Sequence, residues 1–376
     1  MTRRPLSLAL VALAGCASAA PVPPDTDPPC EAIGEVVETQ GVRTAGVARI
    51  EDGEVVGTCY VGEERPGVPA SAATRFSVAS VTKAVAAEAV LRLVADGRVS
   101  LDEPMAAHWV DPDVADNPRT EALTPRHALT HTTGFPNWRF YVEGGRLAFR
   151  SDPGEAYGYS GEGFDWLARF VEAKLGRGFY DLMQETVFDP VGMGSATIAP
   201  YVADTSHFAQ PFDEDGRAYR PWCRPGGYCV PEGHVSAAHG LRVTAGDLAA
   251  LLVSVAEADG YDAALAADRD RVHTPVTGDD AAVECAPDVR CPEAQGYGLG
   301  WSVLDWGHDR LVFHGGSDWS EVTVAAISPV TGDGFVVLLN APNVRALRAM
   351  PEVLALVAPG SPLVAHYERW RQRAGG

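Results

Sequence analysis

Short apolar runs mark two strands near the start of the chain, GVRTAGVARI (residues 41–50) and GEVVGTCYVG (residues 53–62). The polar sequence EDG joins these runs. A tight polar turn between two such runs is typical of a β-hairpin. The first ordered element that the pattern predicts is therefore an antiparallel pair of strands.

Four further runs of this kind lie near the C-terminus. They cover residues 297–305, 310–317, 320–328 and 334–342. Turn sequences such as WGHD and TGDG separate them, which predicts consecutive antiparallel strands.

Between these two groups the apolar residues recur at helical spacing. After Ser80, a stripe with a period of about 3.6 residues consists of Ala84, Ala87, Leu91 and Val94. Glu88 falls beside this stripe and is expected to point outward. Further helices are predicted over residues 162–176, 243–258 and 343–358. Thr244 and Asp247 have the spacing of a capping box at the start of the second of these.

This order of elements predicts an α+β fold with one antiparallel sheet covered by helices. Residues 35–99 and 240–376 are expected to form a sheet subdomain, and residues 100–239 a mostly helical subdomain. The 376-residue chain is long enough for a large core of this kind.

The formal net charge is −20 and the isoelectric point is about 4.8. Nucleic acids and anionic membranes attract basic surfaces, so neither is an expected partner. The sequence contains no pattern that calls for a cofactor.

The first residues have the pattern of an export signal. Two arginines precede an apolar run, which predicts a signal peptide over residues 1–15. The sequence LAGC, which ends at Cys16, resembles a bacterial lipoprotein box. Residues 16–34 are rich in proline and are expected to form an extended tether. The protein is therefore expected to be a periplasmic or cell-surface lipoprotein, which contacts the membrane through a lipid anchor alone. Cleavage after residues 17–19 would instead release a soluble secreted protein.

Six cysteines remain when Cys16 is set aside, and an even number suits disulfides in an oxidising compartment. Six cysteines can pair in many ways. Proximity in the sequence favours Cys223 with Cys229 and Cys285 with Cys291, which leaves Cys30 with Cys59. Neither close pair has the spacing of a zinc knuckle, so no metal is expected.

Ser80 and Lys83 stand three residues apart, in a chain whose other lysine is Lys174. On a helix, residues i and i+3 share a face, and Ser80 would lie at the positive end of the helix dipole. A buried lysine can lose its proton and act as a base, which an arginine cannot do. The pair therefore indicates an activated serine nucleophile.

Two other segments add candidate chemistry. Tyr159 lies in a polar loop before a predicted helix, and a phenol beside an ammonium can relay a proton. His314, Gly316 and Ser317 end a predicted strand, where glycine allows a ligand to approach the backbone.

Together, these three segments resemble the serine β-lactamase and penicillin-binding-protein superfamily, and most closely its class C β-lactamase-related branch. That branch includes esterases, D-aminopeptidases and D-Ala carboxypeptidases. The sequences LTPRHALTHTTGFP (123–136) and VFDPVGMG (187–194) also resemble segments of this branch. The resemblance covers about residues 35 to 355 and implies a β-lactamase/transpeptidase-like fold.

The resemblance implies a role for each candidate residue. Ser80 would be acylated, Lys83 and Tyr159 would share the general-base role, and Tyr159 would protonate the leaving group. The backbone N–H groups of Ser80 and Ser317 would form an oxyanion hole, and His314 would replace the lysine of the family's third motif. The substrate would be a small ester, amide or peptide.

The chain departs from the β-lactamases at two positions. Gly161 stands where their second motif has an asparagine that holds the amide of a β-lactam, and His314 is less cationic than lysine. Both changes favour an esterase or a peptidase with a different substrate over a true β-lactamase, and a true β-lactamase or D-Ala carboxypeptidase stays an alternative.

Three alternatives remain open at this level. GYSGEG (158–163) approaches the nucleophile elbow of α/β-hydrolases but has Glu162 in place of the second glycine. His207, His234 and His239 lack the spacing of a metallohydrolase. A non-catalytic surface lipoprotein that binds peptidoglycan or peptide fragments would belong to another class, and an intact reactive trio argues against it. Residues 200–235 and 275–295 are expected to help form the rim of the cleft.

Overall fold

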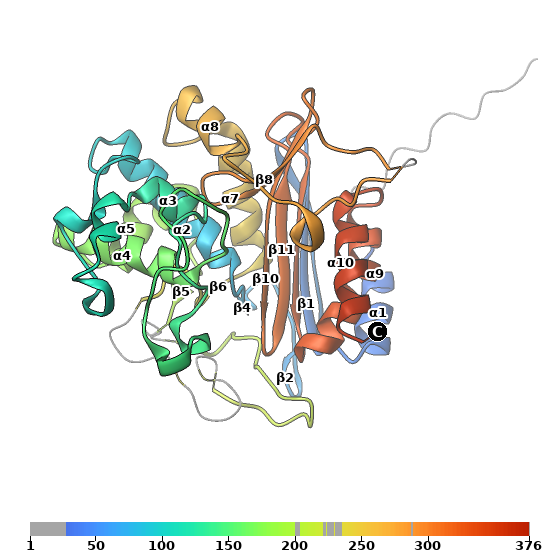
Figure 1. The fold of residues 1–376 in the computed structure, drawn as a ribbon. Helices are drawn as coiled ribbons and strands as arrows, with labels where there is room; N and C mark the ends of the chain where they lie inside the picture. The colour runs from blue at the N-terminus through green and yellow to red at the C-terminus, as the bar shows by residue number, and fades with distance from the viewer. Residues whose placement is uncertain are drawn as a thin grey trace, which may run out of the picture.

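A nine-stranded antiparallel sheet crosses the part of the chain that the computed structural model describes, residues 28–199, 204–220, 223, 229, 235–286 and 289–375 (Figure 1). Its strand order is β3-β2-β1-β12-β11-β10-β9-β8-β7. The strands are β1 Thr44–Glu51, β2 Glu54–Arg65, β3 Val68–Pro69, β7 Thr274–Pro275, β8 Ala294–Tyr297, β9 Ser302–Asp305, β10 Arg310–Asp318, β11 Glu321–Ile327 and β12 Gly334–Asn340. Strands from both ends of the chain meet where β1 pairs with β12, with Val47 opposite Val337.

Helices cover both faces of this sheet (Figure 1). One face carries α1 (Cys30–Thr39), α9 (Asn343–Val357) and α10 (Pro362–Arg373). The other carries α7 (Ala245–Glu257) and α2 (Val81–Ala95). Strand residues alternate between the two cores: Val312 belongs to the core with α2, and Phe313 to the core with α9.

Shorter elements surround α2 on the side away from the sheet. The remaining helices are α3 Pro125–Leu129, α4 Gly161–Leu175, α5 Phe179–Met183, α6 Asp189–Val191 and α8 Ala263–Arg269. A small second sheet has the order β4-β6-β5, with β4 Phe76–Ser77, β5 Thr197–Ile198 and β6 Leu241–Val243. Single 3₁₀ or π turns lie at Met105–Ala107, Pro112–Val114, Pro118–Ala122, Arg139–Tyr141, Glu143–Gly145, Gln184–Phe188 and Gly278–Asp280.

The predicted α+β architecture is confirmed, and the predicted capping box at the start of α7 is present.

The prediction of a single strand over residues 297–305 is wrong. The chain turns between β8 and β9, and Gly300 takes a positive φ of 86° there. A Cβ at Gly300 would collide with Ala87 of α2, so this turn packs directly on the helix.

Two terminal helices were not foreseen. Residues 30–34, expected to belong to an extended tether, form the first turn of α1. The helix α10 follows α9 and packs against it. Both helices bury apolar residues against the sheet, such as Ile33 and Leu363.

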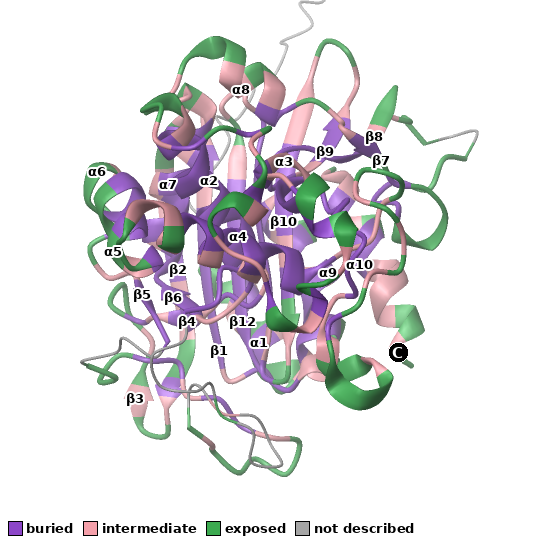
Figure 2. Ribbon diagram, turned by 60° about the vertical axis from the view of Figure 1, so that its left-hand side comes forward, coloured by how far each residue is buried: buried purple, intermediate pink, exposed green. Residues whose placement is uncertain are grey.

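The expectation that Glu88 points outward is also wrong. The helix α2 is buried on every side from Val81 to Leu93, and it appears purple in Figure 2. A helix enclosed between a sheet and other helices has no solvent face, so one apolar stripe could not give its orientation. Glu88 is instead ion-paired with Arg92, and both side chains are buried.

The six cysteines are joined as Cys30–Cys59, Cys223–Cys229 and Cys285–Cys291. These are the three pairs that sequence proximity favours. In the described ranges, no helix has the length and apolarity needed to cross a membrane.

Candidate active site

Ser80 stands at the start of α2, directly before its first residue Val81. Serine usually caps a helix through its side chain, but the Ser80 side chain makes no capping hydrogen bond. Ala79 just before it has a positive φ of 43°, a conformation that alanine rarely adopts. The Ser80 hydroxyl is therefore not used to cap the helix, and it remains available to other groups.

Lys83, one turn further along α2, points back to Ser80. Its Nζ lies 3.2 Å from Ser80 Oγ and donates to the carbonyl oxygen of Ala238 at 3.1 Å. The side chain is completely buried. Burial lowers the pKa of Lys83 to about 7, against a smaller opposing effect of Asp165 and Asp318. A substantial share of the amine is therefore neutral near pH 7.

Tyr159 approaches the same hydroxyl from the loop before α4. The Lys83 Nζ lies 4.8 Å from the centre of its ring. Burial raises the pKa of Tyr159, an effect that the interaction with the Ser80 side chain opposes. The phenol thus keeps its proton at neutral pH, which suits a proton donor.

His131 fixes the backbone next to Tyr159. Its Nδ1 accepts the N–H of Ser160 at 3.1 Å, and its ring lies 4.3 Å from the Tyr159 ring. The residue is fully buried and has a φ of 54°. Burial lowers the pKa of His131 well below its usual range, so the ring is neutral.

The strand β10 closes the other side of the site. It pairs with β9 as far as Phe313 and continues with His314, Gly316 and Ser317 beside β11 alone. A Cβ at Gly316 would collide with the Val78 carbonyl and come within 3.2 Å of the Ser80 nitrogen. Glycine therefore lets β10 lie against the start of α2, which brings the Ser317 segment next to Ser80.

His314 faces this site as a neutral ring. Its Nδ1–H donates to the Gly315 carbonyl at 2.7 Å, which leaves Nε2 with a lone pair. Within the described part of the chain, this buried Nε2 has no hydrogen-bond partner. Burial and the nearby Lys83 charge lower the pKa of His314 to about 3.

A cavity of about 560 Å³ opens from Ser80 along the end of the sheet. Its lining includes Tyr159, His314 and Ser317, together with Tyr157 and Gln295. Among the described residues, the predicted rim segment 275–295 supplies several lining positions.

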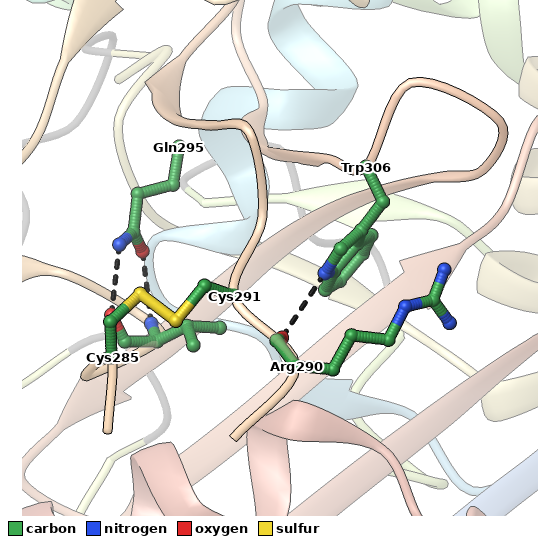
Figure 3. The surroundings of a disulfide bond; sticks show 6 residues. Cys285, Arg290, Cys291, Gln295 and Trp306 are labelled. Atoms are coloured by element: carbon green, nitrogen blue, oxygen red, sulfur yellow. Dashed lines mark hydrogen bonds between the residues drawn. A yellow bond between two sulfur atoms is a disulfide. The ribbon is translucent and has the colours of Figure 1, made fainter. Parts of the chain in front are cut away.

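Figure 3 shows how part of that rim is held. The Cys285–Cys291 disulfide closes a short loop. Gln295 accepts the Val283 N–H at 2.9 Å and donates to the Val283 carbonyl at 2.8 Å. Trp306 donates its indole N–H to the Arg290 carbonyl at 3.2 Å (Figure 3). Of the other predicted rim segment, 200–235, the structure describes residues 204–220, 223, 229 and 235, and none of these lines the cavity.

The structure thus gathers Ser80, Lys83, Tyr159, His314 and Ser317 around one cavity. Cys16 lies outside the described residues. Sequence reasoning gave no role to His131 or to the Ala238 carbonyl. His131 could have been suspected from the LTHTTG segment that carries part of the resemblance, whereas a backbone carbonyl leaves no signal in a sequence.

The alternative sites are not assembled. Ser160 is buried, donates to the Pro136 carbonyl and caps α4 by accepting the Gly163 N–H, so it is no exposed nucleophile. His207 contacts Glu64, and His239 packs against the Trp138 ring. His234 lies outside the described residues.

Known proteins share this fold and parts of this sequence. The sequence model described as Beta-lactamase matches residues 31–358. Esterase EstB of Burkholderia gladioli is 31% identical over 207 residues, which are 47% of this chain and 51% of the esterase. A D-aminopeptidase of Gluconobacter oxydans is 28% identical over 172 residues, 41% of this chain and 32% of the aminopeptidase. The matched part of the chain therefore spans about half the length of the esterase and less of the aminopeptidase.

Among solved structures, the octameric penicillin-binding protein homologue of Pyrococcus abyssi matches with a TM-score of 0.66. The match covers 89% of this chain and 78% of that protein, at 22% sequence identity. This likeness shows the fold.

Proposed function

Because the chain belongs to the Beta-lactamase family, we propose that it is a serine hydrolase that cleaves a small ester or amide through an acyl-enzyme. The observation that carries this proposal is the buried Lys83 amine, 3.2 Å from Ser80 Oγ, with a pKa of about 7. A lysine in this state can accept the serine proton at neutral pH.

In the first step, Ser80 Oγ attacks the carbonyl carbon of the substrate, and its proton passes to the neutral Lys83 amine. The Ala238 carbonyl, which accepts from Nζ at 3.1 Å, keeps that amine directed at Ser80. The carbonyl π bond opens, and its electron pair becomes a negative charge on the substrate oxygen.

The backbone N–H groups of Ser80 and Ser317 would stabilise this oxyanion. Two features support the assignment: the close approach of β10 to the Ser80 nitrogen at Gly316, and the position of Ser80 at the positive end of α2. Removal of one such donor typically lowers the rate about a hundredfold or more.

Tyr159 would protonate the departing alcohol or amine as the bond to the carbonyl carbon breaks. Its raised pKa keeps the phenol protonated, and the Lys83 ammonium can then return a proton to it. In the second step, water attacks the acyl carbon and gives a proton to Lys83. The bond from that carbon to Ser80 Oγ then breaks, Lys83 returns the proton to Oγ, and the acid product leaves.

The site favours esters or simple amides over β-lactams. Gly161 offers no side-chain amide, and the neutral His314 offers a hydrogen-bond acceptor where the β-lactamases place a cation. The relatives are named as an esterase and a D-aminopeptidase, and these names agree with an ester or amide substrate.

Three disulfides also suit an exported protein, and the lipid anchor at Cys16 stays a prediction.

The test is hydrolysis of a p-nitrophenyl ester and of a cephalosporin by the purified chain from Cys30 onward. We expect ester turnover, little or no cephalosporin turnover, and loss of both in Ser80→Ala. A fluorophosphonate should label the wild-type protein at Ser80, located by mass spectrometry.

Ser317→Ala serves as a matched control, because it removes a cavity-lining hydroxyl but keeps the backbone N–H. Turnover that survives in Ser80→Ala would refute the proposal. No turnover and no labelling would favour the alternative of a surface protein that binds peptidoglycan or peptide fragments without cleaving them.

A further inference from the structure

Residues 137–139 lie across the start of α4, directly beside the Tyr159 segment. The Gly161 N–H donates to the Asn137 carbonyl at 3.0 Å, and the Glu162 N–H donates to the same carbonyl at 3.1 Å. Asn137 Oδ1 also accepts from the Gly161 N–H at 3.0 Å. These bonds use the free N–H groups at the helix start to hold a neighbouring loop.

The Trp138 ring occupies the space next to Gly161. A Cβ at Gly161 would lie 2.5 Å from two carbon atoms of the indole, closer than real Cβ contacts allow. An asparagine at this position, as in the β-lactamases, is therefore incompatible with Trp138 where it stands. Gly161 and Trp138 therefore belong together: the glycine leaves space beside α4, and the indole fills that space.

A cluster of charges fixes the loop that carries the indole. Arg139 pairs with Glu162 at 2.6 Å and with Asp111 at 2.7 Å, and its backbone N–H donates to Glu162. Both carboxylates are largely buried. A partly buried bidentate network of this kind holds the Arg139 side chain in one position, and the bond from its N–H to Glu162 fixes the backbone next to Trp138.

The Trp138 indole lies near Lys83, and the Phe140 ring stacks on it on the side toward solvent. The Lys83 Nζ is 5.8 Å from the Trp138 ring, and Phe140 stacks on Trp138 with 5.7 Å between ring centres and 10° between planes. Phe140 is 49% exposed, although large apolar side chains are usually covered. The Trp138–Phe140 pair is therefore a stacked apolar pair that begins beside Lys83 and ends at an exposed ring.

We propose that the Trp138–Phe140 pair binds the acyl group of the substrate and selects a flat, apolar, aromatic acyl group. This inference rests on the proposed function. The indole fills the space beside Gly161, the position at which the asparagine of the β-lactamases holds the amide of a β-lactam. An aryl ring stacked on the indole would take the place of that hydrogen bond, since offset aromatic stacking is favourable.

The experiment compares p-nitrophenyl phenylacetate with p-nitrophenyl acetate, which share a leaving group and differ in the acyl group. We expect the wild-type kcat/KM to be about tenfold or more higher for the phenylacetate. Trp138→Ala should remove this preference and change acetate turnover much less. Trp138→Phe should keep most of it, and Val330→Ala, which changes an exposed residue of the β11–β12 turn, should leave it unchanged.

The outcomes separate the two proposals. Ser80-dependent turnover of both esters without an aryl preference, or with a preference that survives Trp138→Ala, would overturn the acyl-group inference alone. No Ser80-dependent turnover of either ester would overturn the proposed function. If Trp138→Ala does not fold, Phe140→Ala decides, because that side chain is half exposed, and the aryl preference should fall in it.

The competition between residues 161 and 138 for the same space can be tested through stability, independently of activity. Gly161→Asn should lower the melting temperature because the new side chain meets the indole, and the addition of Trp138→Ala should restore part of the loss. Residues in contact give such non-additive changes. Strictly additive changes in melting temperature would show that the two positions do not compete for space.

Discussion

At the scale of single residues, the Lys83 amine has two opposed properties. Its burial lowers its pKa to about 7 and so makes it a base, and the same burial makes its charged form costly in the folded protein. Catalytic capacity and stability can therefore be measured separately at this one position.

The first prediction concerns the pH dependence of activity. The kcat/KM for an ester should rise as the pH rises through about 7, because the neutral form of Lys83 accepts the Ser80 proton. Lys83→Arg, which stays cationic, should lose about a hundredfold or more in kcat. A pH–rate profile tests this, and a rate independent of pH around neutrality would contradict it.

The second prediction concerns stability. Between about pH 7, the folded pKa, and 10.5, the ordinary value, the unfolded chain binds the Lys83 proton and the folded protein does not. The free energy of unfolding should therefore rise with pH across this window. Lys83→Met should be more stable than wild type at pH 7 by on the order of a few kcal/mol. Urea unfolding at both ends of the window should show this advantage shrinking at high pH.

The third prediction concerns His131, which accepts the Ser160 N–H at 3.1 Å beside Tyr159. His131→Phe removes the acceptor and should lower kcat by about tenfold with a smaller change in KM, because the phenol loses its alignment. His131→Asn keeps a side-chain oxygen and tolerates the positive φ, so it should retain more activity. Equal activity in the two variants would assign His131 a packing role alone.

The separate residues of the site could be predicted from sequence, but their surroundings could not. Ser80, Lys83 and Tyr159 carry chemistry that only a few residue types supply, so their spacing is informative. Trp138 looks in the sequence like any core or surface aromatic residue. Its role depends on the space beside Gly161, which becomes known once the loop and α4 are placed together.

At the scale of elements, α2 links the nucleophile to both halves of the fold. Ser80 stands at its start, and the buried Glu88 lies two turns further along. Glu88 pairs with Arg92 at 3.1 Å and accepts the Trp301 indole N–H at 2.9 Å and the Tyr261 hydroxyl at 2.8 Å. One carboxylate thus joins α2 to the β8–β9 turn and to the segment before α8.

The fourth prediction follows from this buried carboxylate. Glu88→Ala should lower the free energy of unfolding by about 3–5 kcal/mol, because it leaves the Arg92 charge buried and without this partner. Glu185→Ala is the matched control, since Glu185 pairs with Arg98 at the surface, and its loss of stability should be much smaller. Urea unfolding of both variants measures the difference, and equal losses would contradict the argument.

An element could be predicted where its burial leaves a recognisable pattern in the sequence. The strand runs at 310–317, 320–328 and 334–342 correspond to β10, β11 and β12, because continuous apolar runs suit strands buried on both faces. The prediction of one strand over residues 297–305 was wrong because Gly300 forms a turn there that packs directly on α2. The predicted orientation of α2 was wrong because a helix that is buried on every side has no polar face that would indicate its orientation.

At the scale of the whole molecule, the two ends of the chain must meet before the site exists. The strands β1 and β12 pair from Thr44 with Asn340 to Ile50 with Gly334, and β10 lies two strands away. The nucleophile comes from an early segment, and the oxyanion strand from a late one. Global unfolding therefore separates Ser80 from Ser317, and stability controls the lifetime of the active site.

The last prediction is that acid weakens the whole fold. Burial lowers the pKa of His314 to about 3, that of His366 to about 4 and that of His131 well below its usual range. As the pH falls below about 6.5, the unfolded chain therefore binds three protons that the folded protein excludes. Glu321 opposes this, because burial raises its pKa to about 7. For these four groups alone, the net difference is two protons, which should lower the free energy of unfolding by roughly 3 kcal/mol for each unit by which the pH falls near pH 5.

His366 offers the cleanest check of this balance. It packs between the rings of Phe313 and Trp370, and among the described residues its buried Nδ1 has no hydrogen-bond partner. His366→Phe should therefore fit and reduce the slope by about 1.4 kcal/mol per pH unit, whereas the exposed His308→Gln should leave it unchanged. Urea unfolding of the three proteins from about pH 7 to about pH 5 measures these slopes. If all three slopes were equal, the acid sensitivity would originate in groups other than the buried histidines.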